Sequence, residues 1–191
     1  ELLEILHSLR SSDDFDTLVL ESLTGIETIC FLHHCRENFD GDISREGFYA
    51  YQQGPKNAAR FDFPDLIARL DDLRSAGKHV MITAHTQVKE DQSPEGTKVL
   101  KHLPYMEKDN WARIHRWAEA LFFLTKKVEE DKSKKGFKGI ARDDIDRLLW
   151  VDGSPYCDAK NWYGMAGCID MGDNGREAYE NLIDAYNRAG N

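Results

Sequence analysis

The sequence predicts an α/β fold in which a mainly parallel sheet is covered by helices on both faces. Two short apolar runs, Asp16–Ser22 (DTLVLES) and Lys78–His85 (KHVMITAH), have the length and composition of buried strands. The residues between them carry helical spacing, and parallel neighbours can be joined only by a long crossover of this kind. Apolar runs of this type are typical of parallel sheets whose two faces are both covered.

The spacing of apolar residues predicts the helices. They are expected over about residues 1–11, 23–38, 63–75, 111–119 and 175–188. Pro64 fits the first turn of the third helix, and Gly77 fits its C-terminal cap. The apolar face of the second helix is expected to contain Leu23, Ile26, Ile29, Cys30 and His33.

The remaining segments are interpreted from their turn residues and short apolar runs. Residues 39–62 predict a loop with a short helix. Residues 86–109 are polar and predict a long connection without secondary structure, a kind of segment that commonly carries function. Residues 120–128 and 147–152 predict two strands that pair as a β-hairpin, with a tip rich in Lys and Gly.

Length, charge and cysteine usage restrict the class of protein. A chain of 191 residues fits one main domain, expected over residues 1–170 and followed by a C-terminal helix within 171–191. Its 34 acidic and 25 basic side chains give a formal charge of −9, which argues against a protein whose whole surface binds nucleic acid. No apolar run approaches a membrane span, and the four cysteines include no CxxC pair. We therefore expect a soluble cytoplasmic protein.

Polar residues follow both predicted parallel strands. Glu21 and Ser22 end the first strand, and His85 and Gln87 end or follow the second. Open α/β sheets place their ligands at the carboxyl ends of their strands, so these side chains are expected to form one catalytic edge. Mg²⁺ accepts a carboxylate or a hydroxyl while keeping several waters, which makes Glu21 and Ser22 the candidate metal ligands. The alternative for each residue alone is an ordinary polar strand end.

Lys160 is a third candidate, in the segment 158–164 (DAKNWYG), which is expected to form a turn after a strand. A lysine in such a turn can direct a point charge at phosphate oxygens, including those bound by a neighbouring subunit. The alternative is a solvated lysine beside a glycine turn.

Basic side chains concentrate between residues 126 and 142 despite the acidic total. This segment could make salt-dependent contacts with the phosphates of a single strand, and a solvated hairpin tip is the alternative. The candidate nucleic-acid contacts are Lys89, Lys98, Lys101, Lys134, Lys135 and Lys138.

Four segments, taken in order, resemble one protein family. LVLESLTGIE, VMITAHTQVK, WARIHRWAEALFF and SPYCDAKNWYG look like the phage-type ATP-binding proteins of the RecA-like superfamily, in the AAA-domain group related to Sak-type single-strand annealing ATPases. The resemblance covers about residues 1–165. It implies a P-loop NTPase core that binds ATP and Mg²⁺ and acts on single-stranded DNA as a homo-oligomer in phage recombination or replication.

The same resemblance implies a role for each candidate residue. Glu21 and Ser22 would be the Walker B element, and His85 would stand where related proteins sense the γ-phosphate, with Gln87 beside it. Residues 86–109 would be the loop that faces DNA. Lys160 would reach into the nucleotide site of the adjoining subunit.

Three features depart from that family pattern. Glu21 replaces the usual Asp and is one methylene longer, which is expected to shift the metal without preventing its binding. Trp162 stands where Arg is common, so a second trans-acting cation is missing and slower hydrolysis is expected. The chain also contains no G-x-x-x-x-G-K-[ST] phosphate loop. Because residues 1–9 already have helical spacing, we expect the first strand and the phosphate loop to lie upstream of residue 1, and the isolated chain to bind ATP weakly or not at all.

These observations favour one function and leave an alternative. The leading hypothesis is the C-terminal portion of a RecA-like ATPase that acts on single-stranded DNA. The alternative is a degenerate, non-catalytic RecA-like module for binding or assembly. A metal-dependent nuclease is disfavoured because paired carboxylates are not placed together on the strand ends.

Overall fold

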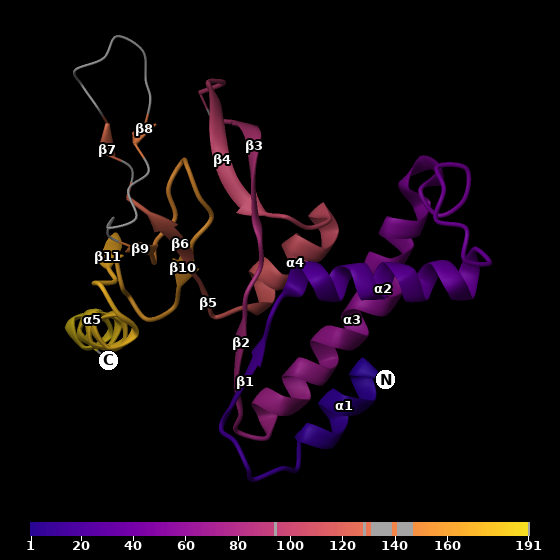
Figure 1. The fold of residues 1–191 in the computed structure, drawn as a ribbon, viewed down its shortest axis with the longest axis horizontal. Helices are drawn as coiled ribbons and strands as arrows, with labels where there is room; N and C mark the ends of the chain where they lie inside the picture. Colours follow the sequence, from indigo (N-terminus) through magenta and orange to yellow (C-terminus); the bar gives the residue numbers. More distant parts are fainter. Residues whose placement is uncertain (94, 128, 131–138, 141–146, 191) are drawn as a thin grey trace. The chain divides into compact units, whose positions relative to one another are not determined.

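The computed structural model describes residues 1–93, 95–127, 129–130, 139–140 and 147–190 (Figure 1). The chain forms two compact units. The first contains residues 1–87 and 104–114, and the second contains residues 88–103 and the chain from His115 onward. Among the described residues, no helix is long and apolar enough to cross a membrane.

The first unit contains a parallel strand pair and the helices that cover one of its faces. Strand β1 (Thr17–Leu20) pairs in parallel with β2 (His79–Ile82), in a register that places Val19 opposite Met81. Helices α1 (Leu2–Leu9) and α2 (Leu23–Asn38) both pack on α3 (Gln53–Ser75), which crosses over between the strands (Figure 1). This arrangement fits the α/β class, with the two predicted strands and the helical crossover in place. The other strand pairings described below are antiparallel, so the expected mainly parallel sheet is not found among the described residues.

The face of the strand pair that carries Val19 and Met81 is open. These two side chains are 54% and 58% exposed, whereas their neighbours along each strand are half-buried. Parallel sheets are ordinarily covered on both faces because their strands are apolar on both. The helices of the first unit therefore cover only one face of the β1–β2 pair.

Helix α2 has the predicted bounds but buries a different face. Ile29 is 56% exposed and His33 is also exposed, so both were wrongly placed on the buried side. The buried residues of α2 are Leu23, Ile26, Glu27, His34 and Cys35. The stripe is rotated because two polar side chains, Glu27 and His34, find hydrogen-bond partners inside, which removes the cost of burying them.

Helix α3 begins at Gln53, ten residues before the predicted start, so Pro64 lies inside it rather than in its first turn. The early turns bury small residues, and a Cβ on Gly54 would lie only 2.3 Å from the backbone oxygen of Phe48. The predicted cap at Gly77 is confirmed. Gly77 has φ +84°, and the N–H groups of Gly77 and Lys78 donate to the carbonyls of Arg74 and Leu73 at 2.9 and 3.1 Å.

The loop between α2 and α3 is organised around one aromatic side chain. Phe48 is completely buried, and its ring contacts those of Phe31, Phe39 and Tyr49 at centroid distances of 5.6, 5.6 and 5.1 Å. The short helix η1 (Ala50–Gln52) then leads into α3. The expectation of a loop and a short helix is therefore right for residues 39–52 and wrong beyond them.

Residues 86–104 form a strand ribbon, which corrects the expectation of a connection without secondary structure. Strands β3 (Thr86–Gln92) and β4 (Lys98–Pro104) form a two-stranded sheet. The connection of a few residues between them can join only antiparallel neighbours. Ser93 N–H donates to Thr97 O at 2.8 Å in this turn, and Lys98 pairs with Glu90 at 2.6 Å. Helix α4 (Lys108–Trp117) follows the ribbon, as predicted for this part of the chain.

The second unit is built on an antiparallel sheet of three strands. Strand β9 (Arg147–Trp150) lies between β6 (Phe123–Lys126) and β11 (Cys168–Asp170). The β6–β9 pairing joins the two segments that were expected to pair. Short strands β7 (Glu129–Glu130) and β8 (Gly139–Ile140) also pair, whereas most of the expected hairpin tip lies outside the described residues.

Helix α5 (Gly175–Arg188) closes the second unit and has the predicted bounds. The Asn174 side chain accepts the N–H groups of Arg176 and Glu177 at 3.0 and 3.1 Å, which fixes where the helix begins. The core below it contains Leu149, Val151, Met165 and Ile169, with Leu182, Ala185 and Ala189 of α5 packed against them.

Candidate functional site

The carboxyl ends of β1 and β2 form one edge of the strand pair. The backbone N–H of Thr83 donates to Leu20 O at 3.0 Å, and the N–H of Leu23 donates to Thr83 O at 2.8 Å. These bonds place Glu21 and Ser22 beside the segment that leads to His85. The two strand ends are therefore together, as the sequence predicted.

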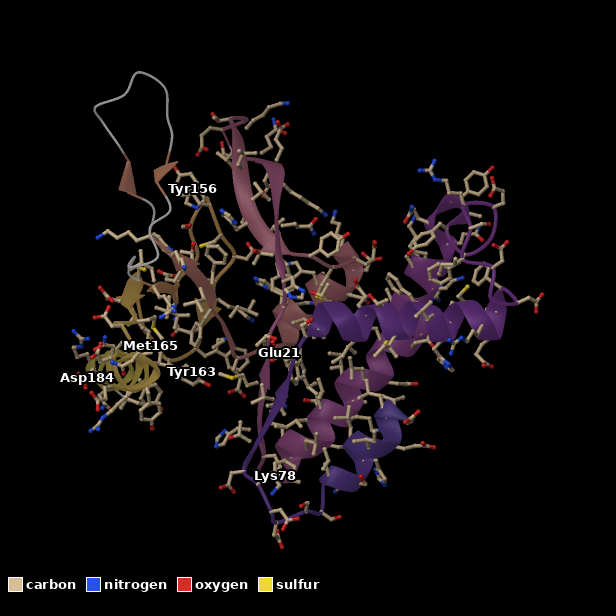
Figure 2. All side chains as sticks on the ribbon, in the orientation of Figure 1. Glu21, Lys78, Tyr156, Tyr163, Met165 and Asp184 are labelled. Carbon is tan, nitrogen blue, oxygen red and sulfur yellow. The ribbon has the colours of Figure 1, made fainter. Side chains whose placement is uncertain are left out.

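Glu21 presents an exposed carboxylate at this edge. It lies between the end of β1 and the start of α2, whereas Lys78 lies at the opposite end of the strand pair (Figure 2). Among the described residues, no cation holds Glu21 in an ion pair. Lys78, in contrast, donates to Phe15 O at 2.6 Å and covers the Phe15 ring, so it is a structural residue. Glu21 is thus free to meet a ligand.

Ser22 is the N-cap of α2. Its Oγ accepts the backbone N–H of Gly25 at 3.3 Å, which satisfies one of the free donors in the first helical turn. A hydroxyl has a second lone pair, so capping leaves Ser22 with acceptor capacity. The residue therefore has a structural role at the edge in addition to the metal-binding role expected of it.

His85 is held by its backbone, and its side chain is exposed. Its N–H donates to the Oγ1 of Thr24 at 3.2 Å, and its carbonyl accepts the N–H of Tyr105 at 2.7 Å. Gln87, two residues further, donates from Nε2 to Pro104 O at 2.9 Å. The amide of Gln87 thus closes the base of the ribbon, and the imidazole of His85 is the freer of the two side chains.

Glu27 and Asn110 are buried polar residues that the sequence reasoning did not find. Glu27 is 7% exposed, and each of its oxygens lies 3.1 Å from the backbone N–H of Glu107. Asn110 has no exposed surface and donates to Glu27 at 2.6 Å. Burial raises the pKa of the Glu27 carboxyl, since desolvation outweighs these hydrogen bonds. The only sequence signal was a Glu spaced four residues from Leu23 on an otherwise apolar stripe.

A metal ion at this edge would have few protein ligands. Among the described residues, no group of three or more His, Cys, Asp and Glu side chains is placed to hold a metal ion. Mg²⁺ in nucleotide sites does not require such a group, because one or two protein ligands are joined by phosphate oxygens and water. The exposed Glu21 carboxylate and the hydroxyl of the next residue, Ser22, could be these one or two protein ligands.

Lys160 belongs to the second unit and lies in a strand, which corrects the expected turn. Strand β10 (Lys160–Asn161) pairs antiparallel with β5 (Ala120–Leu121). The Nζ of Lys160 lies 5.8 Å from the centre of the Trp162 ring, and that ring is 68% exposed. The strand places the ammonium group over an aromatic face, where a weak cation–π contact orients it.

Asn161 is the organising residue of the segment around Lys160, and it was also missed. Its amide nitrogen donates to Val151 O and Met165 O, both at 2.8 Å, and its oxygen accepts the N–H groups of Tyr163 and Met165 at 3.0 Å. Figure 2 labels Tyr163 and Met165 in this part of the unit. All the hydrogen-bonding groups of the Asn161 amide are used to fix the turn that follows Lys160.

The candidate nucleic-acid lysines differ in how much of their charge is available. Lys89 is exposed on β3. Lys98 is paired with Glu90, and Lys101 forms a 2.5 Å ion pair with Asp158 in which both side chains are mostly buried. The charge of Lys101 is thus used inside the second unit. Three further candidates lie outside the described residues: Lys134, Lys135 and Lys138.

Comparison with known proteins identifies one family. A family model described as "AAA domain" matches residues 2–163, which is most of the chain and contains both the strand-end edge and Lys160. No curated protein and no solved structure matched.

Proposed function

Because the chain belongs to the AAA-domain family, whose members are nucleotide-binding proteins of the ATPase type, we propose that it is part of a RecA-like ATPase that acts on single-stranded DNA in phage recombination or replication. One observation carries this proposal. The hydrogen bonds through Thr83 hold the segment with the exposed Glu21 and the partly buried Ser22 next to Thr83, two residues before His85, at the carboxyl edge of a parallel strand pair. Ligands of open α/β folds bind at this kind of edge.

Each residue at the edge has a defined task in the proposed reaction. Glu21 and Ser22 hold the magnesium ion of Mg²⁺-ATP, which when bound neutralises charge on the phosphate oxygens. The imidazole of His85 contacts the γ-phosphate. Lys160 supplies a point charge to the nucleotide of a neighbouring subunit in a homo-oligomer, and the exposed Trp162 beside it replaces a second cation with an aromatic face.

The proposed catalytic site requires a phosphate loop that residues 1–191 do not contain. We propose that an additional segment of the same protein supplies it and adds a strand and a helix to the β1–β2 pair. The exposed Val19 and Met81 support this, because a further strand–helix unit would cover the open face on which they lie. Residues 1–170 would then be part of one RecA-like domain, and the C-terminal helix α5 packs on its core.

Nucleotide binding tests the proposal directly. Residues 1–191 alone should bind Mg²⁺-ATP weakly or not at all in a calorimetric titration, because the backbone cradle for the phosphates is missing. The full gene product should bind and hydrolyse it, and Lys160→Ala should lower turnover about tenfold, by roughly 1.4 kcal/mol of transition-state stabilisation. Lys78→Ala is not a suitable control because Lys78 is structural; exposed Lys108→Ala is the matched control and should leave turnover unchanged.

Two results would contradict this assignment. Micromolar affinity of the 191-residue chain would mean that other residues hold the phosphates. A full gene product without a phosphate loop would favour the second candidate function, a non-catalytic RecA-like module for binding or assembly. The exposed Trp162, where a trans-acting Arg is common in the resembling proteins, is the observation that favours this second function.

Strand binding by the β3–β4 ribbon is the second test. The ribbon replaces the expected DNA-facing loop, and Lys89 presents an exposed ammonium on it. Lys89→Ala should weaken binding to a fluorescent single-stranded oligonucleotide and reduce the dependence of log affinity on log salt by about 0.7, the value for one phosphate contact. Lys101→Ala should leave the salt slope unchanged, because Lys101 is already paired with Asp158. Equal slopes for the wild type and Lys89→Ala would remove the ribbon from the proposal.

A further inference from the structure

A closed ring of hydrogen bonds joins helix α2, His85 and residues 105–107, which directly follow β4 and are called the ribbon foot here. Thr24 and Glu27 stand one turn apart on α2. Thr24 accepts the N–H of His85 at 3.2 Å, and the His85 carbonyl accepts the N–H of Tyr105 at 2.7 Å. Two residues later the N–H of Glu107 returns to α2 by donating to both oxygens of Glu27 at 3.1 Å. All of these residues belong to the first unit.

The bonds to Glu27 complete the ring, and Glu27 is a buried residue. Glu27 is 7% exposed and also accepts Asn110 Nδ2 at 2.6 Å, so one carboxylate fixes two groups at the start of α4. A carboxylate at a helix N-terminus also interacts favourably with the helix dipole. Breaking these buried bonds costs free energy, because a buried N–H group without an acceptor has lost its hydration and gained no partner in return. Glu27 therefore contributes more to the stability of the ring than its other members do.

We infer that Thr24 and Glu27 are positioning residues that make the first turns of α2, the His85 backbone and the ribbon foot move as one body. Ser22, the proposed metal ligand, caps the same helix. A displacement of the α2 N-terminus would therefore be passed to His85 through Thr24 and to the ribbon foot through Glu27. The inference rests on the proposed function and deepens it, because it names the contacts that join the nucleotide edge to the ribbon foot within the first unit.

Hydrogen exchange on the 191-residue chain tests the ring without nucleotide. Glu27→Ala should raise the exchange rates of the Tyr105 and Glu107 amides about tenfold to a hundredfold, while α1 and α3 amides keep their rates. Glu27→Gln retains one acceptor oxygen and should restore part of the protection. Glu37→Ala, an exposed change on the same helix, is the matched control and should alter neither amide.

The decisive variant is Thr24→Val, which removes the hydroxyl acceptor and keeps the shape of the side chain. Thr24 has no bond to Glu107, so faster exchange at Glu107 in this variant would show that the ring opens as a unit. Thr28→Val, one turn along α2 and exposed, is its control: it removes the bond from Thr28 Oγ1 to the Thr24 carbonyl at 3.2 Å but no bond of the ring. A Thr24→Val effect confined to the His85 amide, or a uniform rise across α1 and α3, would overturn the inference.

The pH dependence of stability provides an independent readout on Glu27. Because the pKa of Glu27 is raised, the folded chain binds this proton more tightly than the unfolded chain. The resulting gain in folding stability is fully present below the ordinary pKa of 4.5. It is lost as the pH rises through the raised pKa of the folded state. Glu107 and Cys30 face Glu27, and burial raises the pKa of the Cys30 thiol to about 11, which keeps it neutral throughout this range.

Urea unfolding between pH 4 and 8 should therefore show a decrease in stability for the wild type that Glu27→Gln lacks. Identical slopes in the two proteins would mean that Glu27 is not buried in the ring. These readouts need no ATP, so the ring can fail while hydrolysis is found, and hydrolysis can be absent while the ring is intact. The two proposals are thereby tested separately.

Discussion

Glu21→Ala in the full gene product is expected to lower ATP turnover by about a hundredfold to a thousandfold, which is the range for removal of one group that stabilises transition-state charge. Glu21 is the exposed carboxylate at the edge formed by β1 and β2, and no cation among the described residues neutralises it. The proposal gives the edge no second carboxylate that could take over its role. The loss should therefore appear in kcat at saturating Mg²⁺-ATP.

Two further variants separate metal binding from structural damage. Glu21→Asp moves the carboxylate by one methylene to the residue that the resembling proteins carry, and it should keep most of the activity. Glu37→Ala, on the exposed side of α2, should have full activity. Thermal unfolding of Glu21→Ala should match that of the wild type because the side chain is exposed. Normal turnover in Glu21→Ala would exclude this edge as the metal site.

Element bounds were predictable wherever a local cap sets them. Ser22 and Asn174 each accept backbone N–H groups of the helix that follows, and both helices begin where the sequence predicted. Gly77 ends α3 through a positive φ that glycine adopts without strain. The information for these bounds lies within a few residues of each, so no tertiary structure was needed to find them.

The errors arise where distant partners decide the outcome. Glu27 and His34 are buried in α2 because Asn110 and Asp62 bond them, and those partners lie 83 and 28 residues away. An apolar pattern cannot include such residues, so the predicted face was rotated. The early turns of α3 were missed for a related reason: Gly54 is poor at forming a helix, but it packs closely on Phe48.

The ribbon was missed because its stabilising contacts cross from strand to strand. Val88 and Leu100 are exposed, and most other side chains of β3 and β4 are polar, so no buried apolar alternation marks the strands. The pair Glu90–Lys98 becomes visible only once the register is known. The candidate edge was easier to predict, because parallel strands necessarily bring Glu21 and the segment before His85 to the same side.

Phe48→Ala is expected to have the largest effect on stability, about 3–5 kcal/mol. The ring has no exposed surface and contacts three other aromatic rings, which come from α2 and from both sides of the loop. Its removal leaves a cavity among these rings. The backbone oxygen of Phe48 also accepts the N–H of Gly54 at 3.0 Å, so the start of α3 depends on this residue being in place.

Urea unfolding of the 191-residue chain provides the measurement, with Phe61→Ala as the matched control. Phe61 lies on α3, is 58% exposed, and should cost less than 1 kcal/mol because most of its surface already faces water. The midpoint should fall strongly for Phe48→Ala, with little change for Phe61→Ala. A loss below 1 kcal/mol at Phe48 would mean that the loop between α2 and α3 is not anchored by this ring. A large loss would show that the aromatic cluster holds the C-terminal end of α2 against α3. The cluster would thereby hold in place the helix that is capped by Ser22 and carries Thr24 and Glu27.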